Sequence, residues 1–329
     1  MLSVICPIYN EEKYISKCID SILSQDYPKD DLEVIFADGM STDRTREIIS
    51  AYTSKYPWIK LIDNFQRIVP PALNKAIKIS QGEIILRLDA HASYPSNYFS
   101  SLVNALKRTG ADNVGAVCKT EVLNQTPKAL AIRAVLSHPL GVGNSSFRTG
   151  ISTEQETETV PFGCWPRSAF EKYGYFDERL KRNQDIELNK RITRGGGKII
   201  IIPDTHSIYY ARESFRKIAR NNYGNGLWNI LTVWYTNNLG SLSLRHFIPL
   251  LFVLSILVPC ILSIWWHKII FLAILSLLCY LIVIALTSIK LSVKYRLNWL
   301  YLVMAFSILH FSYGIGSLVG ILKIPFLHR

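Results

Sequence analysis

Three long apolar blocks near the C-terminus constrain the fold more than any other feature. They cover residues 247–266, 269–289 and 299–322, each close to the roughly 20 residues with which a helix crosses a bilayer. Aromatic residues stand at their ends, as in the interfacial belts of membrane proteins: Trp265, Trp266, Trp299 and Tyr301. The alternative is that the three blocks form a large buried helical core. Because of their lengths and their terminal aromatic residues, we predict three membrane spans.

The distribution of basic residues predicts how these spans are oriented. Basic side chains precede the first block and separate the second from the third: Arg212, Arg216, Lys217, Arg220, Arg245, Lys290, Lys294 and Arg296. The connection between the first two blocks holds only His267 and Lys268. Because short cytosolic connections are richer in Lys and Arg, we expect residues 1–245 in the cytosol and the C-terminus outside. The N-terminus turns acidic at once, so no signal peptide is expected.

These features divide the chain into three predicted parts. Residues 1–212 mix charged and apolar residues as a soluble domain does, and residues 247–329 form the membrane region. Residues 213–246 carry cations early and large apolar residues late, which predicts an amphipathic segment on the bilayer surface; a helix packed on the soluble domain is the alternative.

Charge and cysteine usage narrow the class of protein. The formal net charge of +12 suits a protein that lies on anionic lipid or handles an anionic substrate. No zinc-finger, helix-turn-helix or aromatic RNA-binding pattern accompanies it, which disfavours nucleic-acid binding. The six cysteines form no C-x-x-C pair, so we expect a reduced domain without a metal cluster or a disulfide frame.

Within the soluble part, short apolar runs alternate with amphipathic stretches. The runs LSVICPI, LEVIFAD and EIILRL are apolar on both faces, and stretches with helical spacing separate them. This pattern is typical of parallel β–α–β units. We therefore predict an α/β fold with a Rossmann-like, doubly wound and mostly parallel sheet. A helix at 184–194 and a last strand at 198–202 are expected further along.

Polar residues gather where the predicted strands end. The three runs end in acids, a histidine and an aromatic residue: Pro7, Tyr9, Glu11, Asp38, Asp89 and His91. Taken singly, such residues could form turns and helix caps. Because a parallel sheet brings its strand ends to one edge, where ligands bind, we expect these side chains to surround one site.

Asp89 and His91 predict a cation site at this edge. A carboxylate with a second ligand two residues on can hold a divalent cation against a diphosphate; Mn²⁺ suits both ligands, and Mg²⁺ favours the oxygen. In the same site, Asp38 could accept from a nucleobase N–H, Tyr9 could stack on the base, and Glu11 could accept from a ribose hydroxyl.

Substitution at a sugar carbon also needs a base that deprotonates the incoming hydroxyl. Asp185 and Glu187 stand at the start of the predicted helix in NQDIELNKR, where the helix dipole favours an anion. Asp185 is the candidate base. An acidic first turn that only stabilises the helix is the alternative.

The chain resembles family 2 glycosyltransferases, inverting enzymes of the GT-A fold, and is most similar to membrane-attached enzymes of exopolysaccharide synthesis of the succinoglycan type. Five stretches within residues 2–216 match in the family's order: VICPIYNEEKYISKCIDSILSQ, EVIFADGMSTDRT, ALNKAIKISQGEIILRLDAHA, VPFGCWPRSAFEKYGYFDERLKRNQDIELNKRI and YYARESF. The resemblance implies a nucleotide-sugar donor, with a UDP-sugar favoured, a divalent cation (Mn²⁺ or Mg²⁺) and a hydroxyl acceptor.

The resemblance also assigns roles to individual residues. It implies a nucleoside pocket formed by Pro7, Tyr9, Glu11, Asp38 and Asn74. It places the metal and the diphosphate at Asp89 and His91, and the base at Asp185. The sequence departs from the family at His91, where a second aspartate is usual, and at Gln184, where an acid usually precedes the base.

The acceptor is predicted from the start of the membrane region. Processive synthases of this fold carry a Q-x-x-R-W motif there, and the comparable stretch RNNYGNGLW lacks it. We therefore expect one sugar to be added to a saccharide on a polyprenyl diphosphate carrier, with Trp165, Glu187 and Arg212 as acceptor or carrier contacts. The expected location is the cell (inner) membrane, multi-pass, with the catalytic domain on the cytosolic face. Other polysaccharide-assembly enzymes are further candidate partners.

Two other functions fit the same pattern. A polyprenyl-phosphate sugar synthase would use the lipid phosphate itself as acceptor, and Asp185 would then matter less. A non-catalytic membrane scaffold of the same fold would not need Asp38, Asp89 and Asp185 together.

Overall fold

The chain divides into two compact units. The computed structural model describes residues 1–143 and 145–327. One unit, called the sheet unit, holds residues 1–119 and 146–210; the rest of the chain forms the other, called the helical unit.

The observed division differs from the predicted domain of residues 1–212 in one respect. The boundary after Tyr210 is close to the predicted one, but residues 120–145 belong to the helical unit. The reason is that helix α5 (Pro127–Leu136) buries its apolar side chains against helix α13 (Trp299–Lys323). Hydropathy along the sequence does not reveal a contact between segments so far apart.

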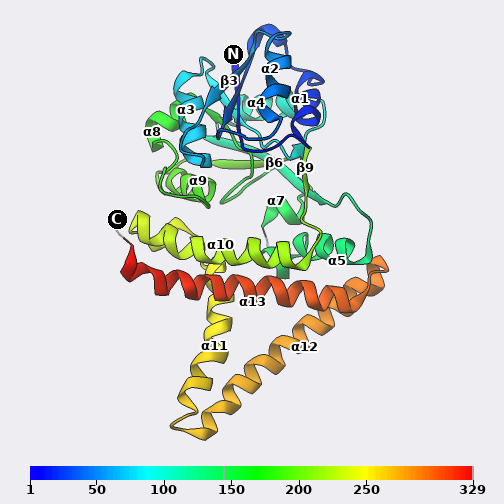
Figure 1. The fold of residues 1–329 in the computed structure, drawn as a ribbon, viewed down its shortest axis with the longest axis vertical. Helices are drawn as coiled ribbons and strands as arrows, with labels where there is room; N and C mark the ends of the chain where they lie inside the picture. The colour runs from blue at the N-terminus through cyan, green and yellow to red at the C-terminus, as the bar shows by residue number, and fades with distance from the viewer. Residues whose placement is uncertain (144, 328–329) are drawn as a thin grey trace. The chain divides into compact units, whose positions relative to one another are not determined.

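The first half of the sheet unit is the predicted alternation of strands and helices. Its elements are β1 (Leu2–Ile8), α1 (Ile15–Leu23), β2 (Leu32–Asp38), α2 (Thr45–Thr53), β3 (Ile59–Asp63), α3 (Val69–Ile79) and β4 (Ile84–Arg87). Strand β1 pairs in parallel with β2 on one side and with β4 on the other, and β2 pairs in parallel with β3 (Figure 1). The direction of winding therefore reverses between β1 and β4, which makes a topological switch point.

The second half of the sheet unit is antiparallel. Its elements are β5 (Ala92–Ser93), α4 (Tyr98–Thr109), β6 (Asn113–Glu121), α7 (Ser146–Thr149), β7 (Gln155–Glu156), β8 (Cys164–Pro166), α8 (Arg167–Tyr173), α9 (Gln184–Arg194) and β9 (Ile199–Tyr210). Strand β8 is antiparallel to β4 and β6, and β9 is antiparallel to β5 and β7. The sheet is thus mixed, where a mostly parallel one was predicted. Strand β9 also continues past the predicted 198–202, because it buries the polar Thr205 and Ser207, which give no apolar signal.

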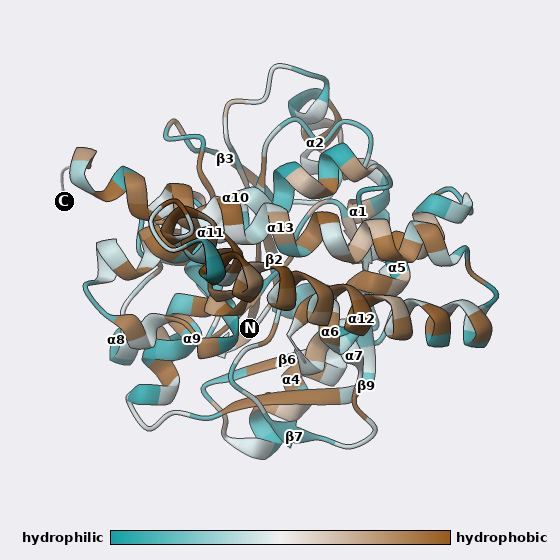
Figure 2. Cartoon of the chain, turned by 90° about the horizontal axis from the view of Figure 1, so that it is seen from below, coloured by the Kyte–Doolittle hydropathy of each residue, from teal (hydrophilic) through white to brown (hydrophobic). Residues whose placement is uncertain are grey.

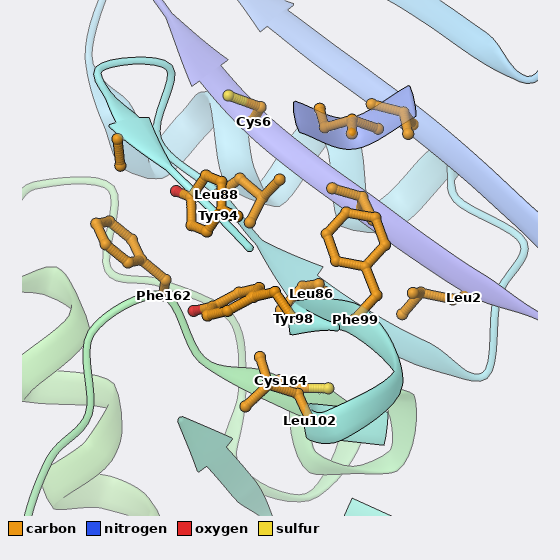
Figure 3. Packing of buried hydrophobic residues seen from close by; sticks show 14 of the residues in the cluster. Leu2, Cys6, Leu86, Leu88, Tyr94, Tyr98, Phe99, Leu102, Phe162 and Cys164 are labelled. Carbon is orange, nitrogen blue, oxygen red and sulfur yellow. The ribbon is translucent and has the colours of Figure 1, made fainter. Parts of the chain in front are cut away.

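Apolar side chains on both faces of the sheet form two cores. On one face, Leu2 and Cys6 of β1 pack with α1 and α4. On the other face, Ile5 of β1 packs with α3, α8 and α9. Both faces of the strand are buried, which is the doubly wound arrangement that its apolar run predicted. Figure 3 shows the first core, with Tyr98 and Phe99 of α4 packed over the sheet.

The helical unit contains the long apolar helices. Its main helices are α5, α6 (Pro139–Val142), α10 (Phe215–Thr236), α11 (Ile248–Leu262), α12 (Ile270–Tyr295) and α13. Three helical stretches are long and apolar enough to cross a membrane, close to the predicted blocks: Leu244–Leu262, His267–Tyr295 and Trp299–Phe326. Figure 2 shows that α11 and α12 are apolar around most of their surface. Short 3₁₀-helices occur at Lys29–Asp31, Leu239–Ser241, Leu244–Phe247, His267–Ile269 and Ile324–Phe326.

A buried acid joins the amino ends of the central strands. Glu33 of β2 accepts hydrogen bonds from the hydroxyl of Ser3 at 2.6 Å and from the ammonium of Lys60 at 3.0 Å, as well as from the backbone N–H of Gln81. Burial alone would raise the pKa of Glu33, but these donors outweigh it and hold the pKa below its ordinary value. The negative charge of Glu33 therefore stabilises the fold.

We predict that Glu33→Gln lowers the stability of the sheet unit by about 1–3 kcal/mol at pH 7, because three donors lose their charged acceptor. The folded-state pKa lies below the unfolded value of about 4.3, so the stabilisation is complete above that pH and is lost as the pH falls through the folded-state pKa. Melting temperatures of the full chain in detergent should therefore differ at pH 7 and converge at acidic pH. Glu83→Gln, at an exposed position, is the control. A difference in melting temperature between the wild type and Glu33→Gln that persists at acidic pH would contradict the stabilising role of the Glu33 charge.

Candidate functional site

A pocket opens at the carboxyl ends of β1, β2 and β4, where the winding of the sheet reverses. Its walls are formed by Pro7, Ile8, Tyr9, Glu11, Gly39, Asn64, Arg67, Ile68, Val69, Ala72, Arg87, Asp89 and His91. Open α/β sheets bind their ligands at such an edge. The structure thus brings together five of the residues that the sequence singled out: Pro7, Tyr9, Glu11, Asp89 and His91.

Tyr9 presents an aromatic surface to this pocket. It follows the end of β1, and 45% of its surface is exposed. The Gly39 N–H donates to the Ile8 carbonyl at 2.8 Å, which holds the end of β2 beside Tyr9. A Cβ at position 39 would lie 3.2 Å from Cδ2 of Tyr9, so the glycine leaves room for the ring. An exposed ring in this position suits stacking on a base.

Asp38 ends β2 next to the pocket residue Gly39, but it is fully buried and does not itself line the pocket. Its Oδ2 accepts from Arg46 at 2.6 Å and from the Ser41 N–H at 3.0 Å, and its Oδ1 accepts from the Ser41 hydroxyl. Arg46 also pairs with Asp63 at the end of β3. The nucleobase contact assigned to Asp38 is a prediction that would require one of these bonds to be exchanged. Sequence analysis missed Arg46, because it lies within an ordinary amphipathic helix.

Asp89 is held in place through its backbone and through one carboxylate oxygen. Its N–H donates to the hydroxyl of Tyr94 at 2.9 Å, and that hydroxyl donates to the Asp89 carbonyl at 3.2 Å. Its Oδ1 accepts two hydrogen bonds from Arg87, at 3.0 and 3.3 Å. The side chain is 21% exposed, and Oδ2 has no partner among the residues that the structure describes. One carboxylate oxygen therefore remains available to a ligand.

His91 and Glu11 contact each other across the pocket. Nδ1 of His91 lies 3.3 Å from Oε1 of Glu11, and the imidazole ring meets the edge of the Tyr209 ring. The Glu11 N–H donates to the hydroxyl of Thr45 at 2.8 Å, which fixes the loop after β1. The contact to His91 uses Oε1 of Glu11, and the ribose contact predicted for Glu11 stays a prediction.

Arg87 is a site residue that sequence analysis missed. Its side chain is 8% exposed, and Nη1 is buried without a hydrogen-bond partner among the described residues. Burial disfavours the charged guanidinium, but the carboxylates of Asp89 and Asp185 outweigh this effect and raise the pKa of Arg87. Arg87 therefore lies within electrostatic reach of both the predicted diphosphate site and the predicted base. The sequence feature that could have identified Arg87 is the presence of a cation inside the apolar run EIILRL.

Asp185 lies in the first turn of α9, as predicted. Its Oδ1 accepts from the Ile186 N–H at 2.9 Å, at the amino end of the helix. Glu187 differs. It is buried and forms a double hydrogen bond with Arg191, one helical turn further on, at 2.8 Å. This carboxylate is thus occupied by Arg191 and faces the interior, and the acceptor contact at Glu187 stays a prediction.

Asn74 and Trp165 are also buried, and the roles expected of them stay predictions. The side-chain amide of Asn74 donates to the Phe176 carbonyl at 2.8 Å and to Glu178 at 2.9 Å, and its oxygen accepts from the Phe176 N–H at 3.0 Å. It is buried and does not line the pocket described above. Trp165 is 1% exposed and packs in the second core against Phe170, so its indole has no surface for an acceptor.

Arg212, the remaining predicted carrier contact, belongs to the helical unit, where it is exposed. Its role stays a prediction.

The donor atoms of the pocket fit a cation that is shared with a substrate. Within the described residues, no group of three His, Cys, Asp or Glu side chains could hold a metal by itself. Asp89 nonetheless offers an unpartnered Oδ2, and the imidazole of His91 lines the same pocket. Mg²⁺ and Mn²⁺ are commonly bound by one or two protein ligands together with substrate phosphates and water. The residues therefore fit a cation completed by a diphosphate.

We predict that Asn74→Ala destabilises the sheet unit by about 1–3 kcal/mol, because the buried N–H and C=O of Phe176 lose their partner. Its affinity for UDP should stay unchanged. The matched variant Tyr9→Ala should do the reverse, weakening UDP about tenfold through lost stacking with little change in stability. Calorimetric titration and thermal melting separate the two effects. Weak UDP binding by a folded Asn74→Ala protein would instead show that Asn74 contributes to the nucleoside pocket.

Comparison with curated proteins found relatives that share most of this chain. The succinoglycan biosynthesis protein ExoA of Rhizobium meliloti is 31% identical over 225 residues, which are 68% of this chain and 67% of ExoA. A Methanococcus voltae protein, dolichyl N-acetyl-alpha-D-glucosaminyl phosphate 3-beta-D-2,3-diacetamido-2,3-dideoxy-beta-D-glucuronosyltransferase, is 28% identical over 235 residues, 68% of this chain and 71% of its own.

Solved structures show the same fold. The mannosyltransferase PcManGT from Pyrobaculum calidifontis, solved with GDP-Man and Mn²⁺, aligns with a TM-score of 0.62 at 19% identity, over 96% of this chain and 86% of its own. Residues 1–349 of Staphylococcus aureus TarS with UDP-GlcNAc align with a TM-score of 0.54 at 18% identity, over 96% and 90%. The GT-A fold that the resemblance implied is confirmed. The profile of Glycosyl transferase family 2 matches residues 3–177, and the chain belongs to this family.

Proposed function

We propose that this glycosyltransferase moves one sugar from a nucleotide-diphosphate sugar, with a UDP-sugar favoured, to a hydroxyl of a polyprenyl-diphosphate-linked saccharide. The product would be an intermediate of a cell-surface polysaccharide. The observation that carries the proposal is the position of Arg87, which lies within electrostatic reach of Asp89 and Asp185 at the edge of a pocket with an exposed Tyr9 ring. A base-stacking surface, a diphosphate site and a proton acceptor are the three parts that such a transfer needs.

The names of the relatives support the class of acceptor. ExoA is named for succinoglycan biosynthesis, and the Methanococcus voltae protein is named for transfer to a sugar on dolichyl phosphate. Both names describe saccharide assembly, the second of them on a lipid carrier. Three candidate membrane helices in this chain would keep the enzyme beside such a carrier. We place the sheet unit on the cytosolic face of the cell membrane, because basic residues flank the apolar blocks.

In the proposed reaction, the hydroxyl oxygen of the acceptor attacks the anomeric carbon of the donor sugar. Asp185 accepts the proton of that hydroxyl as the new bond forms. The bond from that carbon to the diphosphate breaks on the opposite face, and the nucleotide leaves as the diphosphate. One displacement of this kind converts an α-linked donor into a β-glycoside.

Asp89 and His91 would hold the divalent cation, Mn²⁺ or Mg²⁺. A cation bound there supplies charge neutralisation to the diphosphate as it leaves. Arg87 occupies Oδ1 of Asp89, which would leave Oδ2 for the cation. Tyr9 would orient the base end of the donor.

The test of the function is a transfer assay with the full chain in lipid nanodiscs. UDP- and GDP-sugars are each offered with a polyprenyl-diphosphate-linked saccharide or with bare polyprenyl phosphate. We expect one donor to yield a product on the lipid-linked saccharide, with a β linkage by NMR. Product on bare polyprenyl phosphate alone would identify a polyprenyl-phosphate sugar synthase. No product with any donor would favour a non-catalytic membrane scaffold.

Asp185→Asn is the matched variant in this assay. It keeps the shape of the side chain and removes the base, so turnover should fall about 10²–10⁴-fold while UDP affinity is unchanged. Glu171→Gln, an exposed position on α8, is the control and should keep full turnover. A loss smaller than about tenfold in Asp185→Asn would show that another group accepts the proton.

We also predict that Mn²⁺ binds tightly only together with the nucleotide, because the pocket offers two protein ligands and needs the diphosphate to complete the shell. Electron paramagnetic resonance of Mn²⁺ with and without UDP measures this coupling. Asp89→Asn should weaken Mn²⁺ about tenfold or more in the presence of UDP. Equal Mn²⁺ affinity with and without UDP would rule out a cation site shared with the nucleotide. Equal Mn²⁺ affinity of Asp89→Asn and the wild type in the presence of UDP would rule out Asp89 as a ligand. Glu47→Gln, on the surface of α2, is the control.

A further inference from the structure

The three candidate membrane helices are not equally suited to lipid. In the most apolar stretches of α11 and α12, 17% and 11% of the residues are buried within the protein, against 39% in α13. Helices α11 and α12 contact each other, through the Ser255 and Ser276 hydroxyls at 2.6 Å and through the stacked rings of Phe252 and Tyr280. Most of their remaining surface is exposed and apolar, as lipid requires.

Helix α13 lies along α10 for nearly its whole length. The rings of Phe215 and Tyr301 are 6.1 Å apart near the amino ends of the two helices. Further along, glycines bring the backbones together: a Cβ at Gly316 would lie 2.1 Å from the Tyr223 carbonyl oxygen, and a Cβ at Gly320 would lie 2.9 Å from that of Leu227. The two helices therefore run parallel in close contact, as Figure 1 also shows.

Helix α10 is too polar to cross a bilayer. Its first turns carry Arg216, Lys217 and Arg220, all exposed. The stretch beside the middle of α13 reads NNYGN, at 221–225, and Asn229 follows one turn later, bonded to the hydroxyl of Tyr313 on α13. If α13 crossed the bilayer, these cations and amides would enter the hydrocarbon with it, which is unfavourable.

The amino-terminal half of α13 has a second polar neighbour. Helix α5 packs Ile132 and Val135 against Leu302 and Phe306 of α13 in the same apolar cluster. This helix also carries Arg133, which pairs with Glu121 at 2.9 Å. A span of the bilayer at α13 would therefore also draw this ion pair toward the lipid.

We infer that only α11 and α12 of the three candidate helices cross the membrane, as a hairpin, and that α10 and α13 lie side by side in the lipid headgroup region. Figure 1 shows the hairpin extending away from the α10–α13 pair. Two spans return the chain to the side from which it entered, so the end of α13 lies on the same side as α10. This replaces the expectation of three spans with an external C-terminus.

The partner of the α10–α13 pair is a bilayer surface with anionic headgroups. The basic residues Arg216, Lys217 and Arg220 of α10 are exposed at one end of the pair, and Lys290, Lys294 and Arg296 lie at the end of α12, where α13 begins. Trp299 and Tyr295 are exposed at the same junction. Cations with aromatic side chains are the composition that anchors a helix in the headgroup region.

Single cysteines test the topology in the full chain. In a background with Cys260→Ala and Cys279→Ala, we place one cysteine at the hairpin tip (His267→Cys), one at the end of α12 (Tyr295→Cys) and one after α13 (Leu327→Cys). A membrane-impermeant maleimide is applied to right-side-out and inside-out vesicles. We expect Tyr295→Cys and Leu327→Cys to label from the same side, about tenfold better than from the other, and His267→Cys to label from the opposite side. Opposite labelling of Tyr295→Cys and Leu327→Cys would establish a third span and overturn the inference.

A pair of lysine substitutions gives an independent measurement. Ile282 of α12 and Ile315 of α13 are both exposed near the middle of their helices. Ile282→Lys should lower the amount of membrane-inserted protein about tenfold or more, because the charge would enter hydrocarbon. Ile315→Lys should keep it within about twofold, because its ammonium can reach the headgroups. Equal losses in both variants would overturn the inference.

Discussion

The arrangement of the candidate site depends on the buried guanidinium of Arg87. It donates to Asp89 at 3.0 Å and lies within electrostatic reach of Asp185, almost without contact with water. A buried cation requires compensating charge, and breaking such a pair by removing one partner costs about 3–5 kcal/mol. Folding therefore favours the state in which β4 and α9 bring their carboxylates to the same cation. The acid proposed for the diphosphate is hydrogen-bonded to Arg87, and the acid proposed for the proton lies within electrostatic reach of the same guanidinium.

The mixed sheet explains how two acids far apart in the chain both come within electrostatic reach of Arg87. Strand β4 pairs in parallel with β1 and antiparallel with β8, so it is central to the sheet, and its carboxyl end carries Arg87 and Asp89. From β8 the chain passes through α8 to α9, whose first turn holds Asp185. The antiparallel half thus leads to the proposed base, while the parallel half forms the edge at which the pocket opens.

In the helical unit, the same requirement for compensated polar groups selects which helices meet lipid. Asn229 of α10 reaches the hydroxyl of Tyr313 and the carbonyl of His246, and the glycines of α13 allow the close approach that these bonds need. Apolar composition alone makes α13 resemble α11 and α12. Its neighbours distinguish it, because α10 and α5 bring charged and amide groups along most of its length.

The sequence by itself determined the family, the GT-A architecture and the strand ends that form the pocket, since these depend on local patterns: apolar runs, helical spacing and acids at fixed positions after strands. It also located the apolar helices and the place of Asp185 at the start of α9. Only the tertiary structure decided that Asn74, Trp165 and Glu187 are interior residues, that Arg87 joins the site, and that α13 is covered by polar helices. Each of these depends on contacts between segments distant in the chain, and no local pattern records which partner a side chain will meet after folding.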